Sequence, residues 1–482
     1  MPGTDINDVM QRAKAAFGIY RKKSGKEKAD FLVCMADAIE GQRAVLVPLA
    51  MEESHLPEAR LQGELSRTTG QLKLFAALLR EGSWVEASVD YGNPERKPLP
   101  KADIRKMLQP VGPVVVFGAS NFPFAFSTAG GDSASVLASG STLVVKGHPA
   151  HPKTSQAMFA AMQDAVVKSG MPADTVQHVA DASFVVGQAL VQHPLTAGVG
   201  FTGSYRGGRA LMDYAASRRN PIPVFAEMGS VNPVVLYPEI LSQKAEAIAR
   251  QYAGSITVGM GQFCTNPGLI LGIKSADLDT FVNELGAAVQ SVLPLPMLHQ
   301  GIHDSYVQSL DNILDKNQVS VIGKSETKPN GIEAYPTVVK TSSSAFLENK
   351  YLQEEVFGPY SIVVECVDKD DLKKVLSNLE GQLTSTIMGT ENDMADHADV
   401  IDLQIALAGR ILVNDVPTGV EVCHSMVHGG PYPATSDGRF TSVGTTAIKR
   451  WVRPVCYQGF PQQFLPEELK DGNPLQIKRI ES

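Results

Sequence analysis

The sequence predicts an α/β protein with two doubly wound regions, in which helices cover both faces of mostly parallel sheets. Two observations lead to this prediction. Short, β-branched, nearly continuous apolar runs, such as VGPVVVFGA at 111–119 and STLVVKG at 141–147, are typical of strands buried on both faces of a parallel sheet. Helical patterns alternate with these runs, as expected for successive βαβ units.

The first region begins with helices. Residues 5–90 are expected to be helical, because stretches such as 29–39 place apolar residues at three- and four-residue steps on one face. After the two strands above, a helix is predicted over 154–168, where Gly170 and Pro172 end it. The remaining elements predicted here are strands at 197–203 and 222–227, with a helix from residue 207 onward between them.

The second region begins near residue 232 and repeats the pattern. Its predicted strands are 232–237, 269–273, 361–367 and 410–415. A helical pattern over 245–258 precedes the second of these strands. The stretch 419–444 is rich in Gly, Pro, Ser and Thr and is too long for an ordinary connection, so we expect a functional loop.

Length and composition limit the class of protein. A chain of 482 residues is expected to form two or three domains. With 43 Lys and Arg against 51 Asp and Glu it has no broad basic face, so no nucleic-acid partner is expected. No stretch approaches the length of a membrane-spanning apolar helix, and the charged N-terminus lacks the apolar core of a signal peptide, so no membrane association is expected.

The five cysteines are an odd number and are widely spaced, with no CxxC pair. This pattern predicts neither a disulfide framework nor a zinc knuckle, and it favours a reducing, cytoplasmic location. Cys423, His424 and His428 are close in sequence, but Gly429, Gly430 and Pro431 argue against the helix that would align them. We therefore expect no metal site.

Two features of the first region are typical of nucleotide binding. FTGSYRGGR at 201–209 lies where a strand gives way to a helix, and Gly203 and Ser204 precede the helix whose N-terminus would favour a pyrophosphate. The motif departs from G-x-G-x-x-G, and a turn without a ligand would explain it equally well. Lys146 ends a predicted strand and would point into the same crevice, although a surface lysine would fit that position too.

Three residues are candidates for the chemistry. Cys264 in GQFCTNPG follows a helical pattern and precedes a turn, and a thiolate there would be a nucleophile, whereas a buried thiol would only fill the core. Glu227 ends a strand and would activate water or form a salt bridge. Asn121 in NFPF would donate to an oxyanion or complete a turn.

Taken together, these segments resemble the aldehyde dehydrogenases. The ordered matches are NFPF at 121, VVKGHP around residue 146, FTGS at 201, AEMGS at 226, GQFCTNPG at 261, EEVFGP at 354 and VND at 413. The resemblance covers almost the whole chain. FCTNPG, GELSRTTGQLKLF, GPYPATSDGRFTSVG and RPVCYQGFP make the chain most similar to a bacterial branch of the family, which includes α-ketoglutaric semialdehyde dehydrogenases and an NADP-dependent fatty aldehyde dehydrogenase.

The resemblance implies the domain organisation. It assigns 1–94 and 111–229 to a dinucleotide-binding domain, 230–448 to a catalytic domain, and 95–110 and 449–482 to a small β oligomerisation arm and C-terminal tail. A homodimer or homotetramer is therefore expected.

The resemblance also implies the catalytic roles. Cys264 would attack the aldehyde, and Asn121 with the backbone N–H of Cys264 would hold the oxyanion of the thiohemiacetal. After hydride transfer to NAD or NADP, Glu227 would activate the water that hydrolyses the thioester. Further implied residues are Lys146 at the adenosine ribose, Gly203 and Ser204 at the pyrophosphate, Glu355 and Phe357 at the nicotinamide ribose, and Phe122, Phe263, Thr265 and Arg67 along the substrate tunnel.

One departure from the family pattern concerns the cofactor. NAD-linked relatives have a glutamate three residues after the lysine, and this chain has Pro149 there. Without that carboxylate, and with His148, His151 and Lys146 nearby in sequence, NADP is expected to be accepted at least as well as NAD.

The branch implies an aldehyde substrate, most closely α-ketoglutaric semialdehyde (2,5-dioxovalerate), which would be oxidised to 2-oxoglutarate; a medium- or long-chain fatty aldehyde is the alternative. Arg60, Glu64 and Arg67 share one helical face, which would be either a solvated face with an internal ion pair or a cation site for the substrate carboxylate. Outside the family, a cysteine hydrolase using Cys264 with His424 or His428, and no nicotinamide, remains open.

Overall fold

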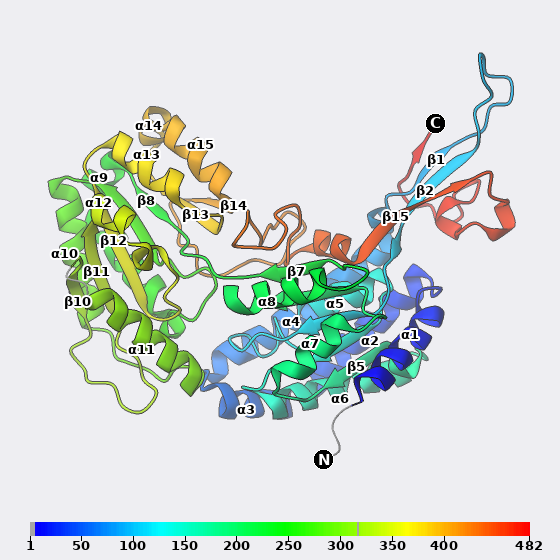
Figure 1. Ribbon diagram of the computed structural model, residues 1–482, viewed down its shortest axis with the longest axis horizontal. Coiled ribbons are helices and arrows are strands. Elements are labelled where there is room, and N and C mark those ends of the chain that lie inside the picture. Colours follow the sequence, from blue (N-terminus) through cyan, green and yellow to red (C-terminus); the bar gives the residue numbers. More distant parts are fainter. Residues whose placement is uncertain (1–4, 316–317) are drawn as a thin grey trace.

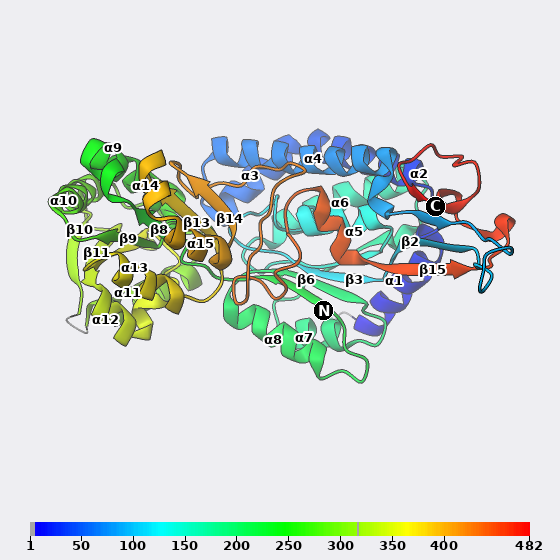
Figure 2. The same cartoon turned by 90° about the horizontal axis from the view of Figure 1, so that it is seen from above.

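The computed structural model describes residues 5–315 and 318–482 and contains three sheets of five, seven and four strands (Figure 1). The two larger sheets belong to two α/β units that lie next to each other, and the four-stranded sheet projects from one of them (Figures 1 and 2). This arrangement confirms the predicted fold class. None of the helices in the described ranges combines the length and apolarity needed to cross a bilayer.

Four helices open the chain, namely α1 (Ile6–Tyr20), α2 (Gly25–Gly41), α3 (Arg43–Ser54) and α4 (Glu58–Glu81). Ser24 caps α2 through a capping box with Glu27, which explains why the helix restarts after the turn at 21–24. The buried face of α2 packs against α4 and α6, as its apolar pattern predicts. The helical prediction for 5–90 is wrong at its end, because 88–90 form strand β1.

The five-stranded sheet is entirely parallel, in the order β5-β4-β3-β6-β7. Its strands are β3 (Val114–Phe117), β4 (Leu143–Lys146), β5 (Val176–Val179), β6 (Gly198–Thr202) and β7 (Val224–Glu227). The strand order reverses between β3 and β6, and ligands bind at the carboxyl ends of strands around such a switch point. Four of these strands lie where they were predicted, whereas β5 was missed because its sequence VQHV is half polar.

Helices α5 (Gly131–Ser139), α6 (Pro152–Lys168), α7 (Phe184–Gln192) and α8 (Tyr205–Ala216) cover this sheet. Two predicted helix starts need correction. α6 begins two residues early because Pro152 fits the first position of a helix. α8 begins at residue 205 because the Ser204 hydroxyl caps it by accepting from the Gly207 N–H at 3.2 Å.

The seven-stranded sheet runs β10-β11-β12-β9-β8-β13-β14, and only its edge pair β10–β11 is antiparallel. Its strands are β8 (Val234–Leu236), β9 (Leu269–Ile273), β10 (Ser320–Lys324), β11 (Thr337–Ser342), β12 (Tyr360–Cys366), β13 (Gln382–Met388) and β14 (Ala408–Val413). β8, β9, β12 and β14 match predicted strands. β13, QLTSTIM, was missed because its buried hydroxyls hide it from a search for apolar runs; those of Thr384 and Ser385 donate to the Asn232 side chain and the Pro233 carbonyl, just before β8.

The helices of this unit are α9 (Pro238–Thr257), α10 (Ala276–Gln290), α11 (Gln300–Leu314), α12 (Ser343–Glu348), α13 (Lys369–Asn378), α14 (Glu391–Asp396) and α15 (Ala398–Leu407). The helix predicted at 245–258 is the C-terminal part of α9, which starts earlier at Pro238 and ends at Thr257.

The small sheet has the order β15-β2-β1-β16, with β1 (Ser88–Asp90), β2 (Ile104–Pro110), β15 (Val452–Gln458) and β16 (Ile480–Glu481). β2 pairs antiparallel with both β1 and β15. The hairpin at 91–103 extends beyond the body of the molecule (Figure 1).

The predicted long loop, 419–444, contains no helix or named strand and runs along the five-stranded unit before the short helix η5 (Thr445–Trp451). It is tied to the end of β7, because Met228 N donates to Ala434 O and Ser436 N donates to Ala226 O. This tie places the loop over the carboxyl end of β7.

Candidate active site

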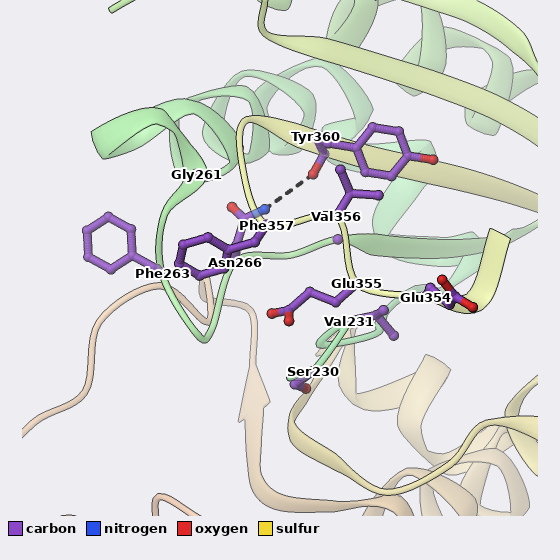
Figure 3. A pocket seen from close by; sticks show the side chains of 11 residues that line it. Ser230, Val231, Gly261, Phe263, Asn266, Glu354, Glu355, Val356, Phe357 and Tyr360 are labelled. Atoms are coloured by element: carbon purple, nitrogen blue, oxygen red, sulfur yellow. Dashed lines mark hydrogen bonds between the residues drawn. The ribbon is translucent and has the colours of Figure 1, made fainter. Parts of the chain in front are cut away.

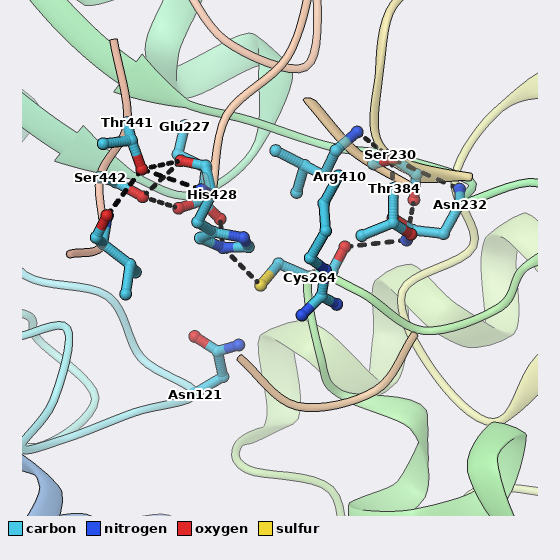
Figure 4. A network of polar contacts seen from close by, with 12 residues as sticks. Asn121, Glu227, Ser230, Asn232, Cys264, Thr384, Arg410, His428, Thr441 and Ser442 are labelled. Carbon is cyan, nitrogen blue, oxygen red and sulfur yellow. Dashed lines mark hydrogen bonds and ion pairs between the residues drawn. The ribbon is translucent and has the colours of Figure 1, made fainter. Parts of the chain in front are cut away.

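Cys264 lies in the loop between η3 (Val258–Gly261) and β9. The Asn232 side-chain amide donates to the carbonyl of Cys264 at 2.9 Å, which fixes the loop. The thiol is half-buried, and its Sγ is 3.4 Å from Nε2 of His428 (Figure 4). The backbone N–H of Cys264 donates to no group in residues 5–315 and 318–482, so it is free to bind a ligand oxygen.

Glu227 is the last residue of β7 and its side chain is buried, at 3% exposure. Its Oε2 accepts a hydrogen bond from the Ser442 hydroxyl at 2.8 Å, and its Oε1 is 3.0 Å from Nε2 of His428. Two residues predicted from separate motifs, Glu227 and Cys264, therefore meet around one imidazole (Figure 4).

His428 is the residue that links them, and sequence reasoning named it only as a partner for a hydrolase or a metal. It is 1% exposed and held by Thr441, whose hydroxyl accepts from the His428 N–H at 2.8 Å, and by Ser442, whose N–H donates to the His428 carbonyl at 2.8 Å. The one sequence signal that pointed to it is the unusually long loop at 419–444.

The charges of this cluster are set by burial and by the neighbours. Burial, and then the negative charge of Glu227, raise the pKa of the Cys264 thiol well above its usual value. Burial acts to raise the pKa of Glu227 as well, but the His428 imidazole and hydrogen bonds from His428, Ser442 and Cys264 outweigh it and lower that pKa. At neutral pH the resting site therefore holds a thiol beside an ionised carboxylate, which is a proton donor next to a proton acceptor.

Asn121 follows β3 and is buried beside the cysteine loop. Its side-chain amide nitrogen donates to the Gln262 carbonyl at 3.2 Å, and its backbone carbonyl accepts from Arg60 at 2.8 Å. The amide is therefore anchored one residue from Phe263 and two from Cys264. The second N–H of this amide forms no hydrogen bond within the described residues, so it is available to an oxyanion on a Cys264 adduct.

Aromatic rings line the space next to this cluster. The rings of Phe122 and Phe263 lie 5.6 Å apart, and the Arg60 guanidinium sits between them at 4.9 and 4.6 Å from the two centroids. The Arg67 guanidinium lies 5.6 Å from the Phe126 ring. The structure thus brings together three of the predicted tunnel residues, Phe122, Phe263 and Arg67.

Thr265, the fourth predicted tunnel residue, is buried at 1% exposure. Sequence reasoning did not place Phe126 at the site.

The interpretation of Arg60, Glu64 and Arg67 as a solvated face is wrong. Glu64 is 5% exposed and accepts the backbone N–H groups of Phe124 and Ala125 at 2.8 and 2.9 Å, and no ion pair joins it to either arginine within the described residues. The face turns inward because α4 packs on the NFPF segment. Glu64 therefore supports the turn that carries Asn121 and Phe122.

The predicted pyrophosphate residues lie at an open edge of the five-stranded sheet. Gly203 and Ser204 are exposed at the N-terminus of α8, and a Cβ at Gly203 would lie 2.6 Å from the Phe201 ring, so a larger residue there would require the ring to move. An exposed helix N-terminus after a parallel strand at the switch point suits a dinucleotide phosphate.

Lys146 ends β4, and burial lowers its pKa although the charge of Asp181 opposes this effect. Asp181 was not a candidate from the sequence, but its carboxylate is the charge that acts on Lys146 at the predicted ribose site. Pro149, at the position of the missing glutamate, is exposed.

Glu355 and Phe357 line a pocket with Ser230 and Phe263 (Figure 3). A Cβ at Gly229 would lie 2.5 Å from the Glu355 carboxylate, so glycine permits this close packing. Burial is the main cause that raises the pKa of Glu355 to about 7, and Glu227 adds to it.

His424 does not join His428 in a metal cluster, because its Nδ1 is hydrogen-bonded to the Thr445 hydroxyl at 2.5 Å. The structure instead groups His428 with Cys264 and Glu227.

Comparison with known proteins gives consistent results. The aldehyde dehydrogenase family pattern matches residues 2–444. The "Alpha-ketoglutaric semialdehyde dehydrogenase 2" of Azospirillum brasilense is 46% identical over 476 residues, which cover 99% of this chain and 91% of that protein. An "Alpha-ketoglutaric semialdehyde dehydrogenase" of Acinetobacter baylyi is also 46% identical, over 99% of this chain and 90% of its own length.

Among solved structures, the betaine aldehyde dehydrogenase of Staphylococcus aureus in complex with NAD+ is similar over 95% of this chain and 88% of that one. The TM-score is 0.78 and the sequence identity is 18%, so this similarity supports only the assignment of the fold.

Proposed function

The chain belongs to the aldehyde dehydrogenase family, whose members oxidise aldehydes with NAD or NADP, and from this premise we propose that it converts α-ketoglutaric semialdehyde to 2-oxoglutarate. The single observation that carries the proposal is the cluster of Cys264, His428 and Glu227, in which a thiol and an ionised carboxylate flank one imidazole. A thiol and a carboxylate are the two groups that an oxidation followed by hydrolysis requires.

In the proposed first half-reaction, Sγ of Cys264 attacks the aldehyde carbon and forms a C–S bond. The thiol proton passes to the ionised carboxylate of Glu227, to which Cys264 donates a hydrogen bond, and from there to solvent, while Nε2 of His428 holds the carboxylate at 3.0 Å. The free N–H of Cys264 and the amide of Asn121 hold the oxygen that becomes negative. When bound, the nicotinamide cofactor accepts the hydride from this carbon.

In the second half-reaction, Glu227 takes a proton from water, which attacks the thioester carbonyl. The C–S bond then breaks, and the products are the carboxylic acid and the Cys264 thiolate, which regains a proton. The lowered pKa of Glu227 keeps it ionised for this task, and the hydrogen bond from Ser442 orients it.

Three arginines support a substrate that carries a carboxylate. Arg60, Arg67 and Arg410 each hold a buried guanidinium nitrogen without a hydrogen-bond partner among the described residues. The charges of Arg67 and Arg410 interact with Cys264, and Figure 4 shows Arg410 next to it. Buried donors of this kind are costly unless a ligand completes them, and the carboxylate and keto oxygens of 2,5-dioxovalerate would do so.

A matched pair of aldehydes tests the substrate. We expect Arg67→Met, which keeps most of the side-chain volume, to lower kcat/KM for 2,5-dioxovalerate at least about tenfold and that for pentanal less than about threefold. Arg250→Met, at an exposed position, is the control. Equal losses on both aldehydes would remove Arg67 from the substrate site.

The same panel separates the alternatives. Long-chain aldehydes preferred over 2,5-dioxovalerate would favour a fatty aldehyde dehydrogenase, for which the rings of Phe122, Phe126 and Phe263 would form the lining. Ester hydrolysis, with no reduction of NAD or NADP by any aldehyde, would favour a cysteine hydrolase built on Cys264 and His428.

We propose the dinucleotide-binding, catalytic and arm segments at the boundaries given by the resemblance. The five-stranded sheet with α1–α8 supports the first, the seven-stranded sheet supports the second, and the projecting sheet with its open edge β15 supports an arm that pairs subunits. We expect light scattering to show a homodimer or homotetramer, and a monomer would contradict this proposal.

The five free cysteines fit a cytoplasmic location.

A further inference from the structure

Cys264, His428 and Glu227 also form a set of ligands for a transition-metal ion. We propose that these three side chains bind one Zn²⁺ ion reversibly and that the ion inhibits the enzyme. A cysteine sulfur, a histidine nitrogen and a carboxylate oxygen are the donor types that Zn²⁺ prefers, and three protein ligands with an open fourth position form a common zinc geometry. In residues 5–315 and 318–482 this is the only group of three such ligands whose donor atoms lie within 4.8 Å of one another.

The distances suit a tetrahedral ion. With zinc–ligand distances of about 2.0 to 2.3 Å, neighbouring donor atoms around a tetrahedral ion lie about 3.3 to 3.6 Å apart. Sγ of Cys264 is 3.4 Å from Nε2 of His428, and that nitrogen is 3.0 Å from Oε1 of Glu227. Shifts of a few tenths of an ångström would bring these two separations to the tetrahedral values. The site is complete when Sγ of Cys264 and Oε1 of Glu227, which lie within 4.8 Å of each other, also move closer.

The supporting contacts leave the donor atoms available. Glu227 Oε2 is occupied by the Ser442 hydroxyl, whereas Oε1 faces Nε2 of His428, another of the three ligands, at 3.0 Å. The Cys264 main chain is fixed by Asn232 without use of the sulfur. Cys264 is the least buried of the three ligands, so we place the open fourth position, which a water molecule would fill, on its side of the cluster.

Charge balance favours the ion in the deprotonated site. Binding displaces the thiol proton, forms a Zn–S bond and releases one H⁺ to solvent. The thiolate and the Glu227 carboxylate then neutralise the two charges of the metal, so that the positive Arg67 and Arg410 face a neutral complex and the nearby Glu355 adds a mild attraction. The ion occupies both the nucleophile and the base, and this is why bound metal excludes the aldehyde.

Binding is measured on the full-length, metal-free enzyme without reference to turnover. Zn²⁺ is titrated in competition with a chromophoric chelator, and Co²⁺ serves as a spectroscopic probe. We expect one ion per chain, a thiolate-to-cobalt absorption band in the near ultraviolet, and protection of Cys264 from alkylation by iodoacetamide. His428→Gln should weaken Zn²⁺ binding at least tenfold, and Cys264→Ser should abolish the cobalt band.

Two control variants exclude other thiols and histidines. His424→Gln changes a neighbouring histidine outside the cluster, and Cys456→Ser removes an exposed thiol on the small sheet, so both should bind Zn²⁺ like the parent enzyme. Unchanged affinity in His428→Gln, loss of the ion in Cys456→Ser, or no stoichiometric binding would overturn the proposal. Because the readouts are metal binding and alkylation, they remain informative whichever aldehyde the enzyme oxidises.

Discussion

The two groups of candidate residues differ in how they are built. The chemical group, Cys264, His428 and Glu227, is largely buried and is assembled from three distant segments that fix one another by hydrogen bonds. The cofactor group, Gly203, Ser204 and Lys146, lies at the carboxyl ends of β6 and β4, the two strands that flank β3 in one sheet, and two of its members are exposed. Every member of the buried cluster is needed for turnover, so removal of one member stops the reaction cycle, whereas residues at an open edge each contribute a separable part of binding.

The largest effect is expected in the buried group. Cys264→Ala should lower kcat for aldehyde oxidation at least about 10³-fold, because no other nucleophile can form the thioester. Cofactor affinity, measured by fluorescence titration, should change less than about twofold. Cys456→Ser is the matched control at an exposed cysteine, and residual activity above a tenth of the parent in Cys264→Ala would break the assignment.

At the cofactor edge a moderate, selective effect is expected. Pro149→Glu should lower the ratio of kcat/KM with NADP to that with NAD by about 10- to 100-fold, because a carboxylate would repel a 2′-phosphate and bind ribose hydroxyls. Asp181→Asn should raise the same ratio a few-fold, because Asp181 is the negative charge that interacts with Lys146. A parent enzyme that prefers NAD a hundredfold would contradict the expected acceptance of NADP.

A smaller effect separates phosphate binding from helix capping. Ser204→Ala should cost about 1 kcal/mol of unfolding free energy, because the cap to Gly207 is lost, and should weaken cofactor binding a few-fold. Ser275→Ala removes an equivalent cap, on the Leu278 N–H of α10. If both variants weaken the cofactor equally, measured by calorimetric titration beside urea unfolding, Ser204 has no role at the phosphate.

The smallest effect concerns stability against pH. Below about pH 4.5, the ordinary pKa of a glutamate, Glu355 is protonated in both the folded and the unfolded state. Between that pH and its folded pKa of about 7 only the unfolded state ionises, so the free energy of unfolding falls as the pH rises. Above pH 7 the loss of stability is complete. Glu355→Gln should therefore raise Tm by about 1–2 °C at pH 8.5 and by nothing near pH 5. The same substitution at the exposed Glu354 should leave both values unchanged, and a gain that is independent of pH would contradict the cause.

The contrast between the two groups also explains what the sequence could predict. Strand ends and glycine turns are local patterns, so most strands of both sheets and the positions of Lys146, Gly203 and Ser204 followed from short segments. The inward face of α4 could not be predicted in this way. The charges of Arg60, Glu64 and Arg67 are typical of an exposed helix face, and only the packing of the NFPF segment on α4 buries them. Strands β5 and β13 were missed because polar side chains that bond within the fold look like loop residues.

The role of His428 could not be predicted for a related reason. It lies 164 residues from Cys264 in the chain, in a loop without regular structure, and only the pairing of that loop with the end of β7 brings the imidazole between the thiol and the carboxylate. Contacts of such range carry no periodic signal in the sequence.

The most direct measurement of the central claim is intact-protein and peptide mass spectrometry of Glu227→Gln after incubation with 2,5-dioxovalerate and NADP or NAD. The first half-reaction should proceed more slowly, with water taking the thiol proton in place of Glu227, and the second should stall, giving about one equivalent of reduced cofactor per chain and an acyl group on the Cys264 peptide. Steady turnover at the parent rate without any acyl group on Cys264 would show that these two residues do not share the chemistry.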